Sequence, residues 1–422
     1  MIDVRALIEK SRDGQVTGLP CFCTANEPVL RAILAFTATS GFPTIVEATC
    51  NQVNQEGGYT GMTPDAFVAW AHELAREAGV PAERLILGGD HLGPNPWRDE
   101  RASIAMDKAR ELVRRYAAAG FRKIHLDASM PCGGEPPLSF EQVAERAAEL
   151  CAVAEAHAPD PDALIYVIGT EVPTPGGETE TPDALEVTSV ERFHDTVETH
   201  RQAFSARGLD AAWPRIVSIV TQPGVDFSHS SIHVPDAAAL APLRDAIDTL
   251  PGLAFEAHST DYQPAETLRA LVENRFFFLK VGPELTFRFR EAVFALAAIE
   301  ADMSGWLVER PSRLTEIIEE RMKANPGHWK AHYRGGAERV RMLRRFSYSD
   351  RIRYYWNDVE ITEALRVLLG NLAAHPLPET LVSQHFHDVE FGCIPTDPAT
   401  LVRHRVQGSV RRYFDACGYR SR

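Results

Sequence analysis

The chain has 422 residues, of which 45% are hydrophobic and 24% are charged, as in ordinary soluble globular proteins. Its 58 acidic and 44 basic side chains give a formal net charge of −14. This balance argues against a nucleic-acid-binding protein, because neutralising phosphates requires a basic face. No apolar run is long enough to cross a membrane, and the charged N-terminal segment has no signal-peptide core. Seven scattered cysteines indicate reduced thiols, so we expect a cytoplasmic protein.

Short β-branched segments alternate with longer helical patterns over residues 1–300. In the helical segments apolar residues recur every three or four positions, which is typical of helices with one buried face. Eight such alternations predict a (β/α)8 TIM barrel, with a doubly wound parallel sheet as the alternative. The predicted strands are 18–25, 43–49, 84–90, 123–129, 163–171, 215–222, 253–258 and 276–282.

After residue 300 the pattern of strands stops. The remaining segment, 301–422, has apolar spacing typical of helices only. We therefore expect a C-terminal helical extension that caps the barrel or mediates assembly into a homo-oligomer. The predicted helices are 313–324, 328–346, 359–375 and 396–418.

Polar and ionisable side chains gather at the ends of the predicted strands. In a (β/α)8 barrel the carboxyl ends of the strands meet on one face, where active sites lie. Packing alone gives no reason for such residues to collect there, so we expect an active site on this face. The candidates are Glu47, Asn51 and Gln55 after the second strand, Asp90 and His91 after the third, His125 and Asp127 on the fourth, Glu171 after the fifth, Gln222 after the sixth, His258, Ser259 and Asp261 after the seventh, and Lys280 and Gly282 at the eighth.

Imidazoles beside carboxylates fit a divalent-metal site. Because His91 directly follows Asp90, one of the two is able to bind metal while the other faces a substrate hydroxyl. His125 lies inside its predicted strand, and we expect it to be a hydrogen-bonded polar residue of the core. Lys280 leaves two chemistries open. Desolvation lowers a lysine pKa and favours a Schiff-base nucleophile, whereas pairing with a phosphate or carboxylate is the alternative that we favour.

Several long segments carry a resemblance to a known family. They are EATCNQVNQEGGYTGMTP (47–64), GGDHLGPNPW (88–97), EAHSTDYQ (256–263), LKVGPELTFRFREA (279–292) and SDRIRYYW (349–356). The chain resembles the tagatose-bisphosphate aldolase accessory-subunit family, some members of which are tagatose-6-phosphate 4-epimerases, and which also carries an older kinase label. It is more distantly similar to class II, zinc-dependent fructose-bisphosphate aldolases.

The resemblance implies roles for the strand-end residues. Asp90 and Glu171 are expected to be catalytic, and His91 and His258 to bind a divalent metal, zinc. The third zinc histidine of the aldolases has no counterpart here, and Gln222 lies nearest to its position. A phosphate loop is expected at Gly282–Thr286. The expected substrate-binding residues are Asn51, Gln55, Ser259, Asp261, Lys280 and Gly282.

The residues and the resemblance favour one reaction. The C4 hydrogen of a 2-ketose is not acidified by the carbonyl, so retro-aldol cleavage of C3–C4 and re-addition is the better route to inversion at C4. A metal supplies the Lewis acid, and Asp90 or Glu171 the base. We expect epimerisation of a phosphorylated ketohexose, tagatose 6-phosphate, to fructose 6-phosphate.

The alternative is a non-catalytic subunit that stabilises a class II tagatose-1,6-bisphosphate aldolase, which the missing strand-6 histidine favours. Phosphorylation by ATP is disfavoured, because the sequence has no GxxxxGK[ST] loop.

Overall fold

The computed structural model describes residues 2–170, 185–389 and 395–420. Eight parallel strands form a closed barrel in the order β1-β10-β9-β6-β5-β4-β3-β2. The predicted (β/α)8 barrel is therefore confirmed, and the doubly wound sheet is excluded. The barrel strands are β1 (Leu19–Cys23), β2 (Thr44–Thr49), β3 (Leu85–Leu92), β4 (Lys123–Leu126), β5 (Ile165–Ile168), β6 (Ile216–Val220), β9 (Ala254–Ala257) and β10 (Phe276–Val281).

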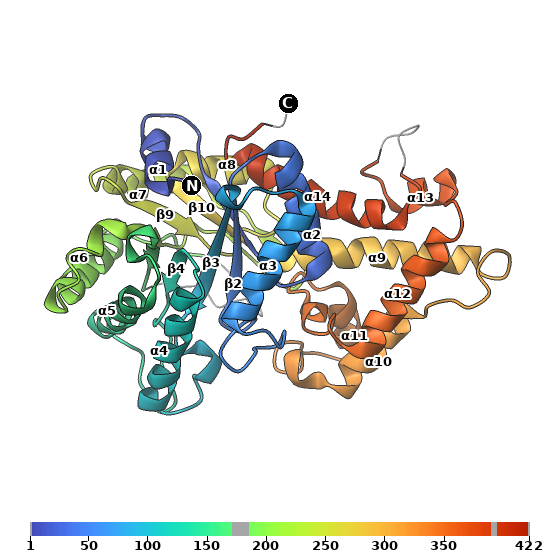
Figure 1. Cartoon of the computed structure of the whole chain (residues 1–422), viewed down its shortest axis with the longest axis horizontal. Coiled ribbons are helices and arrows are strands. Elements are labelled where there is room, and N and C mark those ends of the chain that lie inside the picture. The colour runs from blue at the N-terminus through green and yellow to red at the C-terminus, as the bar shows by residue number, and fades with distance from the viewer. Residues whose placement is uncertain (1, 171–184, 390–394, 421–422) are drawn as a thin grey trace.

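Each barrel strand is followed by a helix that packs on the outside of the barrel (Figure 1). A short antiparallel hairpin of β7 (Asp226–Phe227) and β8 (Ile232–His233) follows β6, and its two-residue strands are too short to be predicted from periodicity. The outer helices are α2 (Glu27–Ser40), α3 (Pro64–Ala78), α4 (Ala102–Ala118), α5 (Phe140–His157), α6 (Val190–Ala206), α7 (Ala241–Ile247), α8 (Ala265–Glu273) and α9 (Pro283–Met303).

Helix α3 illustrates how local sequence sets these elements. The Thr63 side chain accepts a hydrogen bond from the first turn, and Pro64 stands at a position where no N–H donor is needed. Gly79 ends the helix with a φ of 74°, a left-handed conformation that glycine adopts without steric cost. Phe67 and Leu74 lie on its buried face. Caps and an apolar stripe together fix where the helix lies on the barrel.

The N-terminal helix α1 (Val4–Arg12) closes one end of the barrel. Val4 and Ile8 belong to the apolar cluster that fills this end, together with side chains from most of the barrel strands. Outside the cluster, Arg12 donates hydrogen bonds to the carbonyl oxygens of Ile247, Leu250 and Leu253. Water is thus excluded from the barrel on the side opposite the strands' carboxyl ends.

The C-terminal residues form the helices α10 (Leu314–Ala324), α11 (Ala337–Phe346), α12 (Val359–Ala373), α13 (Glu379–His385) and α14 (Pro398–Ala416). The helix predicted over 328–346 is wrong in its first half. Gly335, with a φ of 122°, and Gly336 precede the helix, which begins only at Ala337. The proposed boundary at residue 300 falls inside α9, and the division into two domains stays a prediction.

Helix α14 returns to the barrel. In Figure 1, α9 runs from the barrel towards the C-terminal helices and α14 lies beside it, in contact also with α2 and α8. The Phe414 ring stacks on Phe36 of α2 at 5.5 Å and lies 5.7 Å from Phe22 of β1. These aromatic contacts join the last helix to the first barrel strand and its helix.

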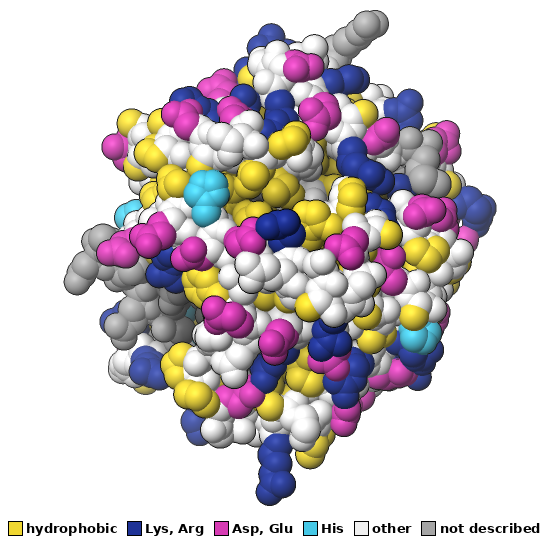
Figure 2. Space-filling view, turned by 90° about the vertical axis from the view of Figure 1, so that its left-hand side faces the viewer, with side chains coloured by type: hydrophobic (Ala, Val, Ile, Leu, Met, Phe, Trp, Pro, Cys, Tyr) yellow, Lys and Arg dark blue, Asp and Glu magenta, His cyan; other side chains and the backbone are white. Residues whose placement is uncertain are grey.

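The face shown in Figure 2 carries no large patch of one charge. Acidic and basic side chains are interspersed there around a band of apolar ones. Within the described residues, no helix combines the length and the apolar character needed to cross a membrane.

Replacing Phe414 by alanine tests the attachment of α14. The side chain is fully buried, so we expect Phe414→Ala to lower the free energy of unfolding by about 3–5 kcal/mol. Arg403→Ala, on the exposed face of the same helix, is the control and should change it by less than about 0.5 kcal/mol. Urea unfolding followed by circular dichroism measures both, and equal stabilities would contradict this packing.

Candidate active site

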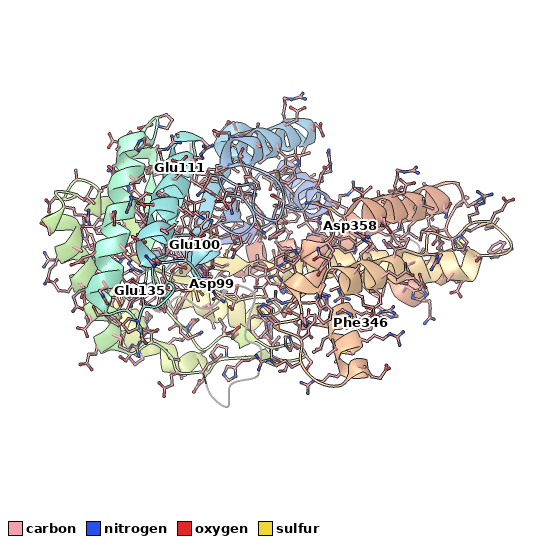
Figure 3. All side chains as sticks on the ribbon, turned by 90° about the horizontal axis from the view of Figure 1, so that it is seen from below. Asp99, Glu100, Glu111, Glu135, Phe346 and Asp358 are labelled. Carbon is pink, nitrogen blue, oxygen red and sulfur yellow. The ribbon has the colours of Figure 1, made fainter. Side chains whose placement is uncertain are left out.

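A pocket opens at the carboxyl ends of the strands. Its walls come from the segments after β1, β2, β3, β9 and β10, from Phe227 of the hairpin, and from residues 353–357 of the C-terminal part. Figure 3 shows Asp99 and Glu100, in the loop before α4, on the barrel side, and Asp358, which follows the lining residue Asn357, on the side of the C-terminal helices. The barrel and the C-terminal helices therefore build the pocket together.

Four buried residues are arranged to hold a metal ion, and two of them, Asp90 and His258, line the pocket. Asp90 of β3, His125 of β4, Glu256 of β9 and His258 each place one ligand atom within 4.8 Å of the others. The buried Nε2 of His125 has no hydrogen-bond partner among the described residues. Its Nδ1 lies 3.0 Å from Asp90 Oδ1 and 3.2 Å from the backbone N–H of His91. In the tautomer whose Nδ1 donates to Asp90, Nε2 is the free nitrogen that a metal requires. The donor set thus fits a divalent cation.

His125 was expected to be a polar core residue, and it does lie fully buried in its strand. The structure also makes it a member of the candidate metal group. His91, predicted as a ligand, lies beside the group rather than in it. Its Nδ1 is 2.8 Å from Asp127 Oδ2, and its ring centroid is 4.9 Å from that of His258.

The backbone at His91 and Ser259 is strained, with φ values of 50° and 52°. Left-handed conformations at residues other than glycine cost free energy and are found most often at functional sites. His91 lies near the end of β3, the strand that supplies Asp90, and Ser259 lies just after β9, which supplies Glu256. The strain turns His91 and Ser259 towards the pocket, which both of them line.

Charges in the site reinforce one another. Burial alone would lower the pKa of His91, but the carboxylates of Asp90 and Asp127 raise it to about 9. Burial would likewise raise the pKa of Asp90, but His91 and the hydrogen bond with His125 hold it well below its usual range. Burial lowers the pKa of His258, and the nearby His91 cation lowers it further. His258 is therefore a neutral imidazole, the form that binds metals.

Below this group, a layer of buried ion pairs fills the middle of the barrel. Lys123 Nζ lies 2.7 Å from Glu47 Oε1 and 2.6 Å from Glu256 Oε2. Lys280 Nζ contacts Glu47 and lies 2.8 Å from Asp90 Oδ1. Burial lowers the pKa of Lys280, as a Schiff-base nucleophile requires. Two carboxylates nevertheless lie within ion-pair distance of its ammonium, which supports the pairing role.

The other predicted site residues are divided between the pocket and its surroundings. Asn51, Ser259, Asp261, Lys280 and Gly282 line the pocket. Gln55 does not, because its Nε2 donates to the carbonyl oxygen of Lys108 and not towards the pocket.

Gln222 and Glu171 are the two remaining residues that were predicted to lie in the site. The Oε1 of Gln222 accepts hydrogen bonds from the N–H groups of Gly224 and Val225 at 2.7 and 3.1 Å, so this oxygen is engaged by its own loop. Glu171 lies outside the described residues, and its role stays a prediction.

The side chain of Asp261 lies at the N-terminus of helix α9. Its Oδ1 accepts hydrogen bonds from the N–H groups of Gly282 and Glu284 at 2.9 and 2.8 Å. Burial raises the pKa of Asp261 to about 7, although both N–H donors lower it. The loop that was expected to hold a phosphate therefore already holds a carboxylate of the protein.

Several residues of the ion-pair layer and of the pocket wall were not predicted from the sequence. Glu256 and Lys123 lie inside strands, where a charged residue among apolar neighbours (AFEA, KIHL) was the available signal. Arg353, Tyr354 and Trp356 reach the pocket from the C-terminal part. They belong to the SDRIRYYW segment, and only the three-dimensional path of the chain brings that segment to the barrel.

The chain was compared with known proteins. Residues 4–418 match a family described as D-tagatose-1,6-bisphosphate aldolase subunit GatZ/KbaZ-like. The chain belongs to this family. A probable tagatose 6 phosphate kinase from Sinorhizobium meliloti 1021 is 42% identical, with 95% of this chain and 100% of that chain covered and a TM-score of 0.87. The resemblance read from the sequence is thereby confirmed.

More distant structural neighbours of this GatZ/KbaZ-like chain are aldolases. The YdjI aldolase from Escherichia coli K12 is 12% identical, with a TM-score of 0.44 and coverage of 87% of this chain and 97% of that one. The fructose-bisphosphate aldolase of Campylobacter jejuni is 13% identical, with a TM-score of 0.46 and coverage of 90% and 93%. Likenesses this remote carry no information about chemistry.

The ion-pair layer of this GatZ/KbaZ-like chain gives a stability prediction. Lys123→Met leaves Glu256 buried without a lysine partner and Glu47 with Lys280 alone. The free energy of unfolding should therefore fall by about 3–5 kcal/mol. Arg31→Ala removes an exposed pair with Glu27 and should cost less than about 1 kcal/mol. Chemical denaturation measures both variants. A Lys123→Met chain as stable as its parent would show that the layer does not depend on this lysine.

The metal ligands are tested by metal content. His125→Ala and His258→Ala should lower the affinity for Zn²⁺ at least ~10–100-fold, because loss of a ligand costs no less than loss of its supporting partner. Gln222→Ala should leave the affinity unchanged, since its oxygen is engaged in its own loop. Competition with a chromogenic chelator gives the affinities. Zinc lost from Gln222→Ala but kept by His125→Ala would reverse this assignment.

Proposed function

We propose that the protein is a sugar-phosphate 4-epimerase that interconverts tagatose 6-phosphate and fructose 6-phosphate by retro-aldol cleavage and re-addition. The observation that carries the proposal is the convergence of Asp90, His125, Glu256 and His258, of which Asp90 and His258 line the pocket. Burying so many ionisable groups costs free energy. A subunit that only stabilised a partner would have no use for them beside a cavity.

The reaction needs a proton acceptor at the C4 hydroxyl. Asp90 is placed for this task because it lines the pocket. Its Oδ1 is engaged by His125 and Lys280, and its Oδ2 accepts from the Cys23 thiol at 3.6 Å and lies 3.7 Å from His91 Nε2. When the C4 hydroxyl proton passes to Asp90, the C3–C4 bond breaks and its electron pair forms an enediolate over C2 and C3. The other product is glyceraldehyde 3-phosphate.

Inversion requires the aldehyde to present its opposite face before the bond re-forms. On re-addition the enediolate carbon attacks the aldehyde, and Asp90 returns the proton to the new C4 hydroxyl. A divalent cation bound to His125, Glu256 and His258 would supply a Lewis acid for the developing negative charge. The His91 cation, held protonated by Asp90 and Asp127, adds positive charge beside the same site.

The second candidate is a stabilising subunit of a class II tagatose-1,6-bisphosphate aldolase. The family description, which names an aldolase subunit, favours it. The hydrogen bond of Gln222 within its own loop also favours this candidate, because Gln222 then does not replace the third histidine ligand of the aldolases. The two candidates differ in what the chain does alone, since only the epimerase converts substrate without a partner.

The decisive assay incubates the purified chain with tagatose 6-phosphate and follows fructose 6-phosphate with a coupled enzyme. Asp90→Asn removes the proton acceptor while keeping the shape of the side chain, so kcat should fall at least ~100-fold. Glu171→Gln in the same assay tests the alternative base. Treatment with a chelator should abolish turnover, and Zn²⁺ should restore it.

Stability separates chemistry from structure in this assay. The thermal unfolding midpoint of Asp90→Asn should lie within the range of midpoints measured for the other variants. An unchanged kcat per folded molecule would reject Asp90 as the acid–base group. No turnover by the parent chain, together with activation of an added aldolase, would establish the stabilising subunit in place of the epimerase.

A further inference from the structure

Three features of the pocket have the chemistry to bind a phosphate. They are the backbone N–H groups at the start of α9, the ammonium of Lys280 and the guanidinium of Arg353. Each is a known type of phosphate ligand. Their contacts decide which of them is available.

The N–H groups at the start of α9 are occupied. Those of Gly282 and Glu284 both donate to Asp261 Oδ1, and Asp261 is only 2% exposed. A phosphate at this position would have to displace a buried carboxylate and approach its negative charge. This end of the pocket is therefore closed to a phosphate.

The ammonium of Lys280 is also occupied. It contacts Glu47 and lies 2.8 Å from Asp90 Oδ1, within the buried ion-pair layer. Withdrawing it would leave Glu47 with Lys123 alone and would remove the lysine partner of Asp90, which is unfavourable for buried carboxylates.

The guanidinium of Arg353 is not paired in this way. It donates to the carbonyl oxygen of Ser349 and, at 3.0 Å, to the hydroxyl of Tyr354. Among the described residues it forms no ion pair with a carboxylate. It lines the pocket and remains partly accessible, so it presents a positive charge to the pocket.

The surrounding contacts hold Arg353 in place. Asp350, three residues earlier, has a φ of 41° and pairs with Arg290 of α9 at 2.9 Å, with both side chains buried. The Tyr262 hydroxyl, from the segment after β9, donates to the carbonyl oxygen of Tyr348 at 2.6 Å. Both contacts tie the segment to the barrel, which preorganises the arginine and lowers the entropy that binding would cost.

We propose that Arg353 binds the phosphate of the substrate and that Asp261 excludes a second phosphate from the N–H groups at the start of α9. This inference rests on the proposed function and specifies its substrate class. The site takes a ketohexose with one phosphate and rejects 1,6-bisphosphates.

Calorimetric titration of the full chain with tagatose 6-phosphate and with unphosphorylated tagatose tests Arg353. Arg353→Gln should weaken the binding of tagatose 6-phosphate about 10- to 100-fold, the size of a lost charge-assisted contact. Binding of tagatose should be unchanged. Arg353→Lys, which keeps the charge but not the planar fork, should recover part of the loss. Arg341→Gln, the same charge change on the exposed face of α11, should alter neither.

The outcomes distinguish this inference from the epimerase itself. An equal loss of affinity for tagatose and tagatose 6-phosphate in Arg353→Gln would overturn the phosphate assignment even if the parent chain is an epimerase. If the parent chain does not convert tagatose 6-phosphate, titration with inorganic phosphate still tests the site. Binding that is lost in Arg353→Gln supports the assignment, and equal binding overturns it.

Asp261 is tested with a matched pair of variants. Asp261→Ala frees the N–H groups of Gly282 and Glu284, and affinity for tagatose 1,6-bisphosphate should rise at least ~10-fold. Asp261→Asn keeps the Oδ1 acceptor, so it should gain much less. If the folded Asp261→Ala chain binds the bisphosphate no better than its parent, the exclusion by Asp261 is wrong.

Discussion

A layer of ion pairs inside the barrel is the constraint on which the rest of the site depends. Barrel interiors are ordinarily filled with apolar side chains, yet here Lys123 and Lys280 meet Glu47, Glu256 and Asp90 with almost no exposure to water. Pairing offsets the cost of desolvation only when the geometry is good and every charge has a partner. The strands on either side are therefore held to one register.

The glycine at position 88 shows how strict that register is. Gly88 pairs with Glu47 across β2 and β3, and a Cβ atom at Gly88 would lie 2.8 Å from Glu47 Cγ. A larger residue there would push the carboxylate away from both lysines. Asp90, two residues further along β3, belongs to this layer and to the candidate metal group at once. The same contacts that balance the charges also fix the position of the proposed proton acceptor.

Much of the molecule was predictable because it depends on local patterns. Apolar periodicity gave the eight strands and their helices, and the position of Asp90 and His258 after their strands placed both at the pocket. The helix at 328–346 was overextended because apolar spacing outweighed Gly335 and Gly336 in the prediction. The roles of Glu256 and Arg353 depend on contacts between segments distant in sequence, which a local pattern does not contain. The amide oxygen of Gln222 accepts hydrogen bonds within its own turn, a local contact that the sequence did not reveal, and its role as a metal ligand stays a prediction.

The return of α14 to the barrel has a consequence for how the chain reaches this structure. Phe414 packs on Phe22 and Phe36, contacts that span almost the whole sequence, with residues 304–397 looped out between the last barrel helix and α14. Contacts between residues so far apart in the sequence form slowly, because the entropy of closing a long loop opposes them. Until they form, the apolar outer face between α2 and α9 stays open to water. That face is then the part of the folding protein most exposed to aggregation, and the part a chaperone would recognise.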